Sequence, residues 1–189
     1  MESALIVSYT KKGVDYFSEI LNADSCEKIT SLPSGGEARR LLLEQDFDLV
    51  IINAPLPDES GENLSRHIAS KGASQVILVV KSEYFDEISA ATEKEGVLVV
   101  AKPINNSIFW ATVKLAKSTF SRLKKMQAEN SKLKQKIEDI RMIDRAKCIL
   151  ISRLNIGEQD AHRLIEKQAM DMRTTRRAVA EEVLKVYEN

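Results

Sequence analysis

The amino-acid sequence predicts an α/β domain with a doubly wound, five-stranded parallel sheet, followed by an all-α region. Short apolar runs alternate with helix-length amphipathic segments through residues 1–117. No Gly or Pro then interrupts residues 104–156, which is typical of one very long helix. We therefore expect three parts: an α/β domain (1–117), a coiled-coil linker (118–142) and a C-terminal three-helix module (143–189).

The predicted strands are continuous apolar runs rich in β-branched residues, which is typical of strands buried on both faces of a parallel sheet. They are residues 5–7, 49–52, 76–80 and 97–101, with a weaker strand at 28–32. The predicted helices between them are residues 14–21, 36–45, 62–70 and 83–94. In such a fold, ligands bind beyond the C-terminal ends of the strands.

The charge of the chain is zero overall but is unevenly distributed. Residues 1–117 carry 12 Lys+Arg and 17 Asp+Glu, a net charge of −5, and residues 118–189 carry 16 and 11, a net charge of +5. A polyanion would therefore meet the C-terminal part, although charge alone does not establish nucleic-acid binding.

Two further features bear on the location of the chain. There is no run of 18 apolar residues and no basic segment before the first apolar run, so we expect neither a membrane span nor a signal peptide. We expect a cytoplasmic protein in which Cys26 and Cys148 are buried thiols, with neither a disulfide nor a metal site.

The ends of two predicted strands carry recognisable motifs. Residues 48–61 read DLVIINAPLPDESG and residues 99–104 read VVAKPI. They resemble the third strand with its following loop, and the fifth strand with its Lys-Pro pair, of a two-component receiver domain. The resemblance covers about residues 3–117 and includes the order of the strands.

The departures from the receiver pattern concern its chemistry. Ser8 and Tyr9 replace the acidic pair that holds magnesium, Asn53 replaces the phosphoacceptor Asp, and Lys81 replaces a Thr or Ser. Only Lys102 is retained. An amide is neither a nucleophile for phosphoryl transfer nor a strong ligand for a hard cation, so we predict a pseudo-receiver that is not phosphorylated and has no cofactor.

Asp58 is the one carboxylate expected near this site. We expect it to form a loop ion pair with Lys102 or Lys81. Whether these two lysines bind another anion is left open.

A heptad pattern lies within the long helix. Five of its six a and d positions are apolar, which predicts a parallel two-stranded coiled coil whose one Asn fixes register and oligomeric state. The a positions are Leu123, Asn130 and Ile137, and the d positions are Met126, Leu133 and Ile140. The alternative is an amphipathic helix that packs on its own chain.

Residues 156–157 and 172–175 are predicted breaks that divide the C-terminal part into three helices. Thr174 is expected to cap the last helix, and Met170 to lie on the apolar face of the helix before it. This part resembles the ANTAR family of RNA-binding transcription antitermination regulators over about residues 135–187. The blocks that carry the resemblance are residues 146–150, 158–165, 168–171 and 179–181.

The resemblance implies a dimer that binds paired stem-loops in leader RNA and prevents a terminator hairpin from forming. Basic and stacking side chains are the candidate contacts to RNA phosphates and loop bases. They are Lys147, His162, Arg163, Lys167, Arg173, Thr174, Arg176 and Arg177.

Two other functions remain open: a DNA-binding transcription factor, and a protein–protein adaptor that uses the pseudo-receiver. An enzyme is not expected, because the sequence offers no nucleophile–base pair, metal cluster or phosphate loop. A regulatory protein partner that masks the dimer and constitutive activity are both open.

Overall fold

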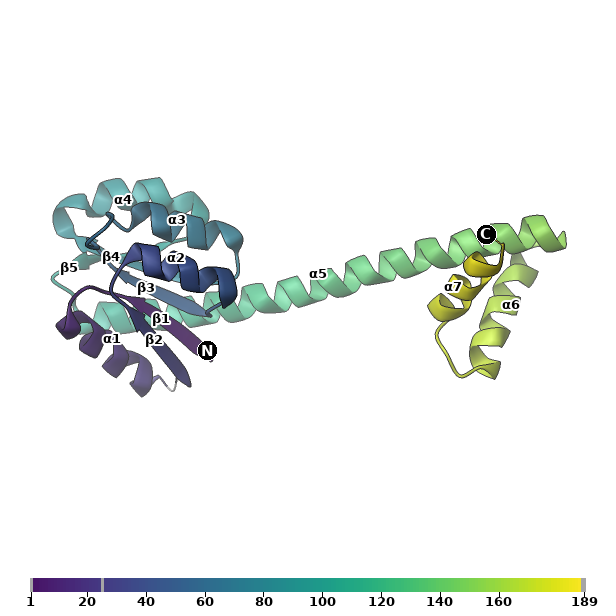
Figure 1. Cartoon of the computed structure of the whole chain (residues 1–189), viewed down its shortest axis with the longest axis horizontal. Coiled ribbons are helices and arrows are strands. Elements are labelled where there is room, and N and C mark those ends of the chain that lie inside the picture. The colour runs from purple at the N-terminus through teal and green to yellow at the C-terminus, as the bar shows by residue number, and fades with distance from the viewer. Residues whose placement is uncertain (1, 25, 188–189) are drawn as a thin grey trace. The chain divides into compact units, whose positions relative to one another are not determined.

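The computed structural model describes residues 2–24 and 26–187. Its contacts divide the chain into two compact units, residues 1–124 and 125–189. The first unit contains the sheet and the second consists of helices (Figure 1).

Five parallel strands form the sheet of the first unit. They are β1 (Ser3–Val7), β2 (Lys28–Leu32), β3 (Leu49–Asn53), β4 (Gln75–Lys81) and β5 (Leu98–Lys102). Their order is β2-β1-β3-β4-β5, and Ile6, Ile51 and Ile77 lie side by side on the three central strands. The winding direction changes between β1 and β3, so the carboxyl ends of these two strands form the topological switch point.

Helices cover both faces of the sheet (Figure 1). The helices are α1 (Lys11–Ala23), α2 (Gly35–Glu44), α3 (Glu62–Lys71), α4 (Phe85–Thr92) and α5 (Asn106–Leu154). Phe17 of α1 and Phe109 of α5 are buried on one face, while Ala38 of α2 and Leu64 of α3 are buried on the other. The expected doubly wound α/β fold is confirmed.

The helix predicted over residues 83–94 is divided into three pieces. A 3₁₀ turn at Ser82–Tyr84 precedes α4, and a second one at Glu93–Glu95 follows it. The Thr92 hydroxyl donates to Ile88 O at 2.8 Å, and Gly96 ends the segment at a φ of 74°. Glycine adopts this left-handed conformation without the steric cost of a Cβ, so the chain turns here into β5.

Side-chain caps start the first two helices. Thr10 Oγ1 accepts from Gly13 N at 3.2 Å, and Ser34 Oγ accepts from Glu37 N at 3.3 Å. Ser34 also donates to Glu37 Oε1 at 3.0 Å. These bonds satisfy amides that have no partner within a first helical turn.

The second unit is a three-helix module built from the end of α5, α6 (Glu158–Asp171) and α7 (Arg176–Tyr187). Ala146 of α5, Ala161 of α6 and Ala180 of α7 are fully buried. Small side chains at these positions let the three helices approach closely. Leu150, Ile165 and Val179 fill the rest of this core.

The turn between α6 and α7 is a Schellman motif. Thr174 N donates to Ala169 O at 2.9 Å, and Arg173 N donates to Met170 O at 3.1 Å. Arg173 has a φ of 48°. The N-cap of α7 is Thr175, whose Oγ1 accepts from Ala178 N at 3.2 Å, so the prediction that Thr174 is the cap was wrong. The amide of Thr174 instead belongs to the end of α6.

The apolar heptad side chains of α5 are exposed in the single chain, by 44–58% of their surface: Leu123, Met126, Leu133, Ile137 and Ile140. The same heptad frame, continued towards the N-terminus, assigns Phe109 and Ala116 to a positions, and both are fully buried. The coiled-coil dimer stays a prediction.

Some other expectations can be compared directly with the structure. Cys26 is half-buried and Cys148 is exposed, so the prediction of two buried thiols was wrong for Cys148; both are free cysteines. Cys148 lies on α5 between buried Ala146 and Leu150, on the side of the helix away from the core. In residues 2–24 and 26–187, no helix has the length and apolar character needed to cross a membrane.

Candidate functional site

The carboxyl ends of β1 and β3 bring together the two residues that replace receiver acids. Asn53 Nδ2 donates to Ser8 Oγ at 3.0 Å, and Ser8 Oγ donates to Thr10 O at 3.3 Å. Val7 and Ile52 pair in register, so the residues that follow them lie level at the same sheet edge. Ser8 is buried, whereas Tyr9 is 69% exposed.

Helix α1 packs closely on this amide–hydroxyl pair. A Cβ added at Gly13 would lie 2.6 Å from both Asn53 Nδ2 and Ser8 Oγ. The first turn of α1 therefore leaves no room for a larger side chain beside Ser8 and Asn53. The Ser8 hydroxyl thus accepts one hydrogen bond and donates another within this group.

The retained lysine is directed to the backbone. Lys102 Nζ donates to Ala54 O, the carbonyl just after β3. Burial, and then the nearby charge of Lys81, lower the pKa of Lys102. Lys81 itself is exposed and lies 3.5 Å from the Glu83 carboxylate.

Asp58 does not pair with either lysine, so that prediction was wrong. Its two carboxylate oxygens accept from Gly35 N at 3.0 Å and from Gly36 N at 2.8 Å. These hydrogen bonds lower the pKa of the Asp58 carboxyl. The N-terminus of α2 provides two unpaired amides and a favourable dipole. These hold the Asp58 carboxylate at the start of α2 instead of in an ion pair with a lysine.

These residues do not fit the magnesium ion that phosphorylated receivers use. Ser8, Tyr9 and Asn53 supply neutral oxygens and no carboxylate, and Mg²⁺ prefers carboxylate ligands. In the described parts of the chain, no three His, Cys, Asp or Glu side chains form a group that could hold a metal.

A second cluster of polar residues lies on the three-helix module. Arg163, Lys167 and Met170 are exposed on α6 at positions i, i+4 and i+7, so they share one face of the helix. Arg173 and Thr174 follow in the exposed turn. We call these five residues the α6 face.

Arg176, His162 and Glu166 form a linked group next to the α6 face. Arg176 Nη1 lies 3.0 Å from Glu166 Oε1, and His162 Nε2 lies 3.3 Å from the same oxygen. This group joins the start of α7 to the middle of α6. All three side chains remain partly exposed to solvent.

Two of the predicted RNA contacts hold the module together. Lys147 is only 15% exposed and bridges Asp144 Oδ1 at 2.7 Å and Glu158 Oε1 at 3.3 Å. Those bonds raise the pKa of Lys147, the bond to Asp144 most. Arg177 pairs with Asp139 at 2.6 Å and with Glu181 at 2.9 Å. Both residues therefore connect helices of the module.

Met170 departs from its predicted position, because 72% of its surface is exposed. The buried face of α6 consists of Ala161, Ile165 and Ala169. Its spacing of four residues was present in the sequence, and Met170 lies one position beyond that row. A large apolar side chain is therefore exposed among basic residues.

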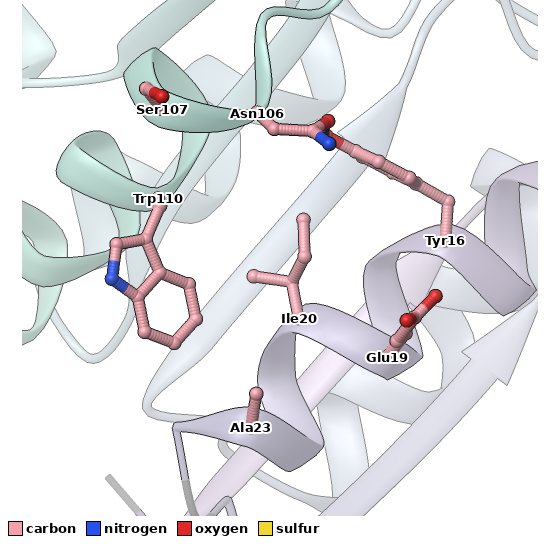
Figure 2. A pocket seen from close by; sticks show the side chains of 7 residues that line it. All are labelled: Tyr16, Glu19, Ile20, Ala23, Asn106, Ser107 and Trp110. Carbon is pink, nitrogen blue, oxygen red and sulfur yellow. Dashed lines mark hydrogen bonds between the residues drawn. The ribbon is translucent and has the colours of Figure 1, made fainter.

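A hollow of about 450 Å³ lies on the first unit between α1 and the start of α5. Figure 2 shows Trp110, Ile20 and Ala23 bordering it from the two helices. Tyr16 Oη donates to Asn106 Oδ1 at 2.9 Å at its other end, where the two side chains meet (Figure 2). No feature of the sequence pointed to this hollow.

Comparisons with known proteins agree with both units. The response regulator receiver domain matches residues 4–114, and the ANTAR domain matches residues 131–184. The chain is 29% identical over 167 residues to the transcriptional regulatory protein PdtaR of Mycobacterium tuberculosis. That similarity covers 88% of this chain and 82% of PdtaR.

Solved structures show the same fold in the first unit. The signal receiver domain of an HD domain-containing protein from Pseudomonas fluorescens Pf-5 has a TM-score of 0.58 and 19% identity, covering 66% of this chain and 92% of that one. The receiver domain of the TMAO respiratory system response regulator TorR has a TM-score of 0.55 and 20% identity, covering 64% and 99%. The chain belongs to the response regulator receiver family, and it carries an ANTAR domain after the receiver domain.

Proposed function

We propose that this chain is a transcription antitermination regulator that binds paired stem-loops of a leader RNA as a parallel homodimer. The observation that carries the proposal is the exposed α6 face inside the ANTAR domain. Arg163, Lys167 and Arg173 supply three positive charges there. Among the described residues, none forms an ion pair with these three, so their charge is available for phosphate.

The shape of the module favours loops over duplex DNA. Val179, Ala180 and Val183 of α7 are buried, so this helix serves mainly in packing. A major-groove reader needs a polar recognition helix instead. RNA loops present splayed bases and phosphates, which a short basic surface can contact.

Two copies of the module suit two adjacent stem-loops. The exposed heptad side chains between residues 123 and 140 would be buried in a parallel pair of helices. Once one module has bound, the second binds at a raised effective concentration. Each protomer would then contact one stem-loop.

A filter-binding assay tests the RNA-binding step. It compares an RNA with two stem-loops, the same RNA with one stem-loop, and duplex DNA, over a series of salt concentrations. We expect the paired stem-loops to bind most tightly. Combined Arg163→Gln, Lys167→Gln and Arg173→Gln changes should weaken binding and reduce the logarithmic salt slope by about 3, roughly 1 for each contact.

The matched control removes the same charge from the first unit by Lys11→Gln, Lys12→Gln and Lys71→Gln, three exposed positions. This control should leave RNA affinity unchanged. Tighter binding to duplex DNA would favour the DNA-binding alternative. Equal RNA binding by the two triple variants would contradict a role for the α6 face.

Single-round transcription tests antitermination itself. The template places the paired stem-loops so that the second overlaps a terminator hairpin. We expect the intact protein to raise read-through, and the α6-face triple variant to leave termination unchanged. The function requires no catalysis, and it requires the chain to act in the cytoplasm with nascent transcripts.

We infer that phosphorylation does not control this activity. The hydrogen-bonded Asn53–Ser8 pair, the close approach of Gly13 and the absence of a carboxylate at positions 8, 9 and 53 support the inference. A regulator of this kind would be constitutively active or controlled by another molecule.

An adaptor function is the second candidate, and the α1–α5 hollow favours it. Trp110 is the one Trp of the chain and lines this hollow beside Ile20 (Figure 2). Its fluorescence would therefore report a protein that docks there. A shift on adding a purified candidate partner without Trp, absent with an Ile20→Glu variant, would support the adaptor function.

A further inference from the structure

A hollow of about 390 Å³ lies beside the α6–α7 turn. It is lined by Ala169 and Met170 at the end of α6, by Thr174 in the turn, and by Glu166 and Arg176. Its size is at the lower end of clefts that hold small ligands, which run from roughly 300 to 1,000 Å³. It contains both apolar and polar groups.

The Schellman turn fixes the wall of this hollow. The bond from Thr174 N to Ala169 O, at 2.9 Å, ties the turn to the last turn of α6. Arg173 occupies the left-handed position at a φ of 48°, where Gly is the usual residue. The exposed Arg173 guanidinium therefore lies beside the hollow, at a backbone position where Gly would cause less strain.

The apolar part of the hollow includes an exposed Met170, and basic residues lie close to it in the chain. Met170 is 72% exposed, and Lys167 precedes it on α6 while Arg173 follows it. A polarizable thioether packs well against a flat aromatic ring. The basic groups at the rim suit a ligand that carries phosphate.

The polar part of the hollow can recognise a base edge. Arg176 and His162 hold the Glu166 carboxylate, which accepts hydrogen bonds from ring or exocyclic N–H groups. The Thr174 hydroxyl can donate or accept. These polar groups line the same hollow as Ala169 and Met170, and sites that stack a base and bond its edge also combine polar and apolar groups.

We propose that this hollow receives one nucleobase unstacked from the loop of the bound RNA. Met170 stacks on the base, Glu166 and Thr174 bond its edge, and Arg173 contacts the adjoining phosphate. The proposal rests on the RNA binding proposed above. It explains a preference for loops, because a base inside an A-form duplex is stacked and paired and cannot enter the hollow.

The test uses the full chain and an RNA with two stem-loops whose loop sequences are randomised and then enriched by binding. In the enriched RNA, each loop nucleotide in turn is replaced by an abasic one. We expect one loop position at which the abasic change weakens wild-type binding about tenfold, the loss expected for one stacked base. Met170→Ala should weaken the binding of the intact RNA by a similar factor.

At that position, the losses of binding free energy from the abasic change and from Met170→Ala should not add, because both changes remove the same contact. Met170→Leu, which keeps the apolar surface, should bind as the wild type does. Val186→Ala is the control, since Val186 is 68% exposed on α7 and does not line the hollow. A thermal melt checks that each variant is folded.

The outcomes separate the two proposals. Absence of any enriched RNA would overturn RNA binding and the base site together. RNA binding in which Met170→Ala has no effect, or adds fully to every abasic change, would overturn the base site alone. In that case, a protein that competes with RNA for the α6 face would become the better explanation of exposed Met170.

Discussion

Arg177 Nη1 lies 2.6 Å from Asp139 Oδ1, and this ion pair joins α7 to α5 within the second unit. Gln135 donates to the same Asp139 oxygen at 2.9 Å. These bonds, the one from Gln135 most, lower the pKa of the Asp139 carboxyl. Arg177 also pairs with Glu181 one turn along α7, so its side chain is held at two points.

Loss of this pair should loosen α7. We expect Arg177→Ala to speed hydrogen exchange in peptides covering residues 176–187, because α7 loses its polar attachment to α5. Arg177→Lys should be intermediate, since Lys cannot bond both carboxylates with one planar group. Exchange measured at pH 7 by mass spectrometry provides the check, and peptides from α3 serve as the internal control. Unchanged exchange in Arg177→Ala would show that the apolar core alone holds α7.

Restoring only the phosphoacceptor should not restore phosphorylation. In Asn53→Asp, Ser8 and Tyr9 still supply no carboxylate for Mg²⁺, so the transferring phosphoryl group is not neutralised. We expect no adduct by intact mass after treatment with acetyl phosphate and Mg²⁺, for the wild type and for Asn53→Asp.

A variant with Ser8→Asp, Tyr9→Asp and Asn53→Asp is the matched comparison, because it also carries the missing acidic pair. Magnesium-dependent binding of beryllofluoride should appear only in this variant. A stoichiometric phosphoryl or beryllofluoride adduct on the wild type would contradict the interpretation that the first unit is a pseudo-receiver.

The exposed heptad side chains should form a dimer at micromolar concentration. Leu133→Asp places two carboxylates in the seam of a parallel pair, which costs several kcal/mol. The dimer dissociation constant should rise by about 100-fold or more. Sedimentation equilibrium measures this change. Ser131→Asp at a b position is the control, and a monomeric wild type would contradict the coiled-coil prediction.

Asn130 should decide how specific this dimer is. Asn130→Ile should preserve or raise stability while admitting other oligomers, because the buried amide is what disfavours them. The same sedimentation experiment would show species larger than a dimer. A purely dimeric Asn130→Ile protein of lower stability would count against Asn130 as a register residue.

Asp58 should make the first unit sensitive to acid. Bonds from Gly35 N and Gly36 N lower the pKa of its carboxyl in the folded state. Such a group adds stability above its unfolded pKa, about 3.9, and that stability is lost as the pH falls through the folded pKa. The melting temperature of Asp58→Asn should therefore fall less than that of the wild type between pH 7 and pH 3. Parallel falls in the two proteins would argue against this contribution.

The sequence predicted most of the elements because each strand and helix carries its own period. The four apolar runs and the weaker strand at residues 28–32 became β1 to β5, and the heptads lie on α5. The sequence pattern does not show which charged side chains form ion pairs with one another. Lys147 and Arg177 were predicted to be free basic residues, but each pairs with one carboxylate on its own helix and one on another helix. Asp58 bonds amides more than twenty positions away, which no local pattern indicates.

The errors at the α6–α7 turn have a different cause. Thr174 and Thr175 are equally good caps by residue type, and only the left-handed Arg173 decides which of them starts α7. Met170 is apolar like the buried residues of α6 but lies one position beyond their row, and 72% of its surface is exposed. At helix ends, the path of the backbone decides which residue is the cap and which side chains are buried. Hydrophobic periodicity cannot locate these positions to within one residue.

The Arg177–Asp139 pair also bears on where a fragment that contains only the ANTAR domain should begin. A fragment that begins at residue 143 keeps all three helices and the buried alanines, but it leaves Arg177 without Asp139 and removes Gln135. A fragment that begins before residue 135 keeps both. In deletion mapping, Gln135 and Asp139 would thus count as part of the ANTAR domain, although they lie within the predicted coiled-coil linker.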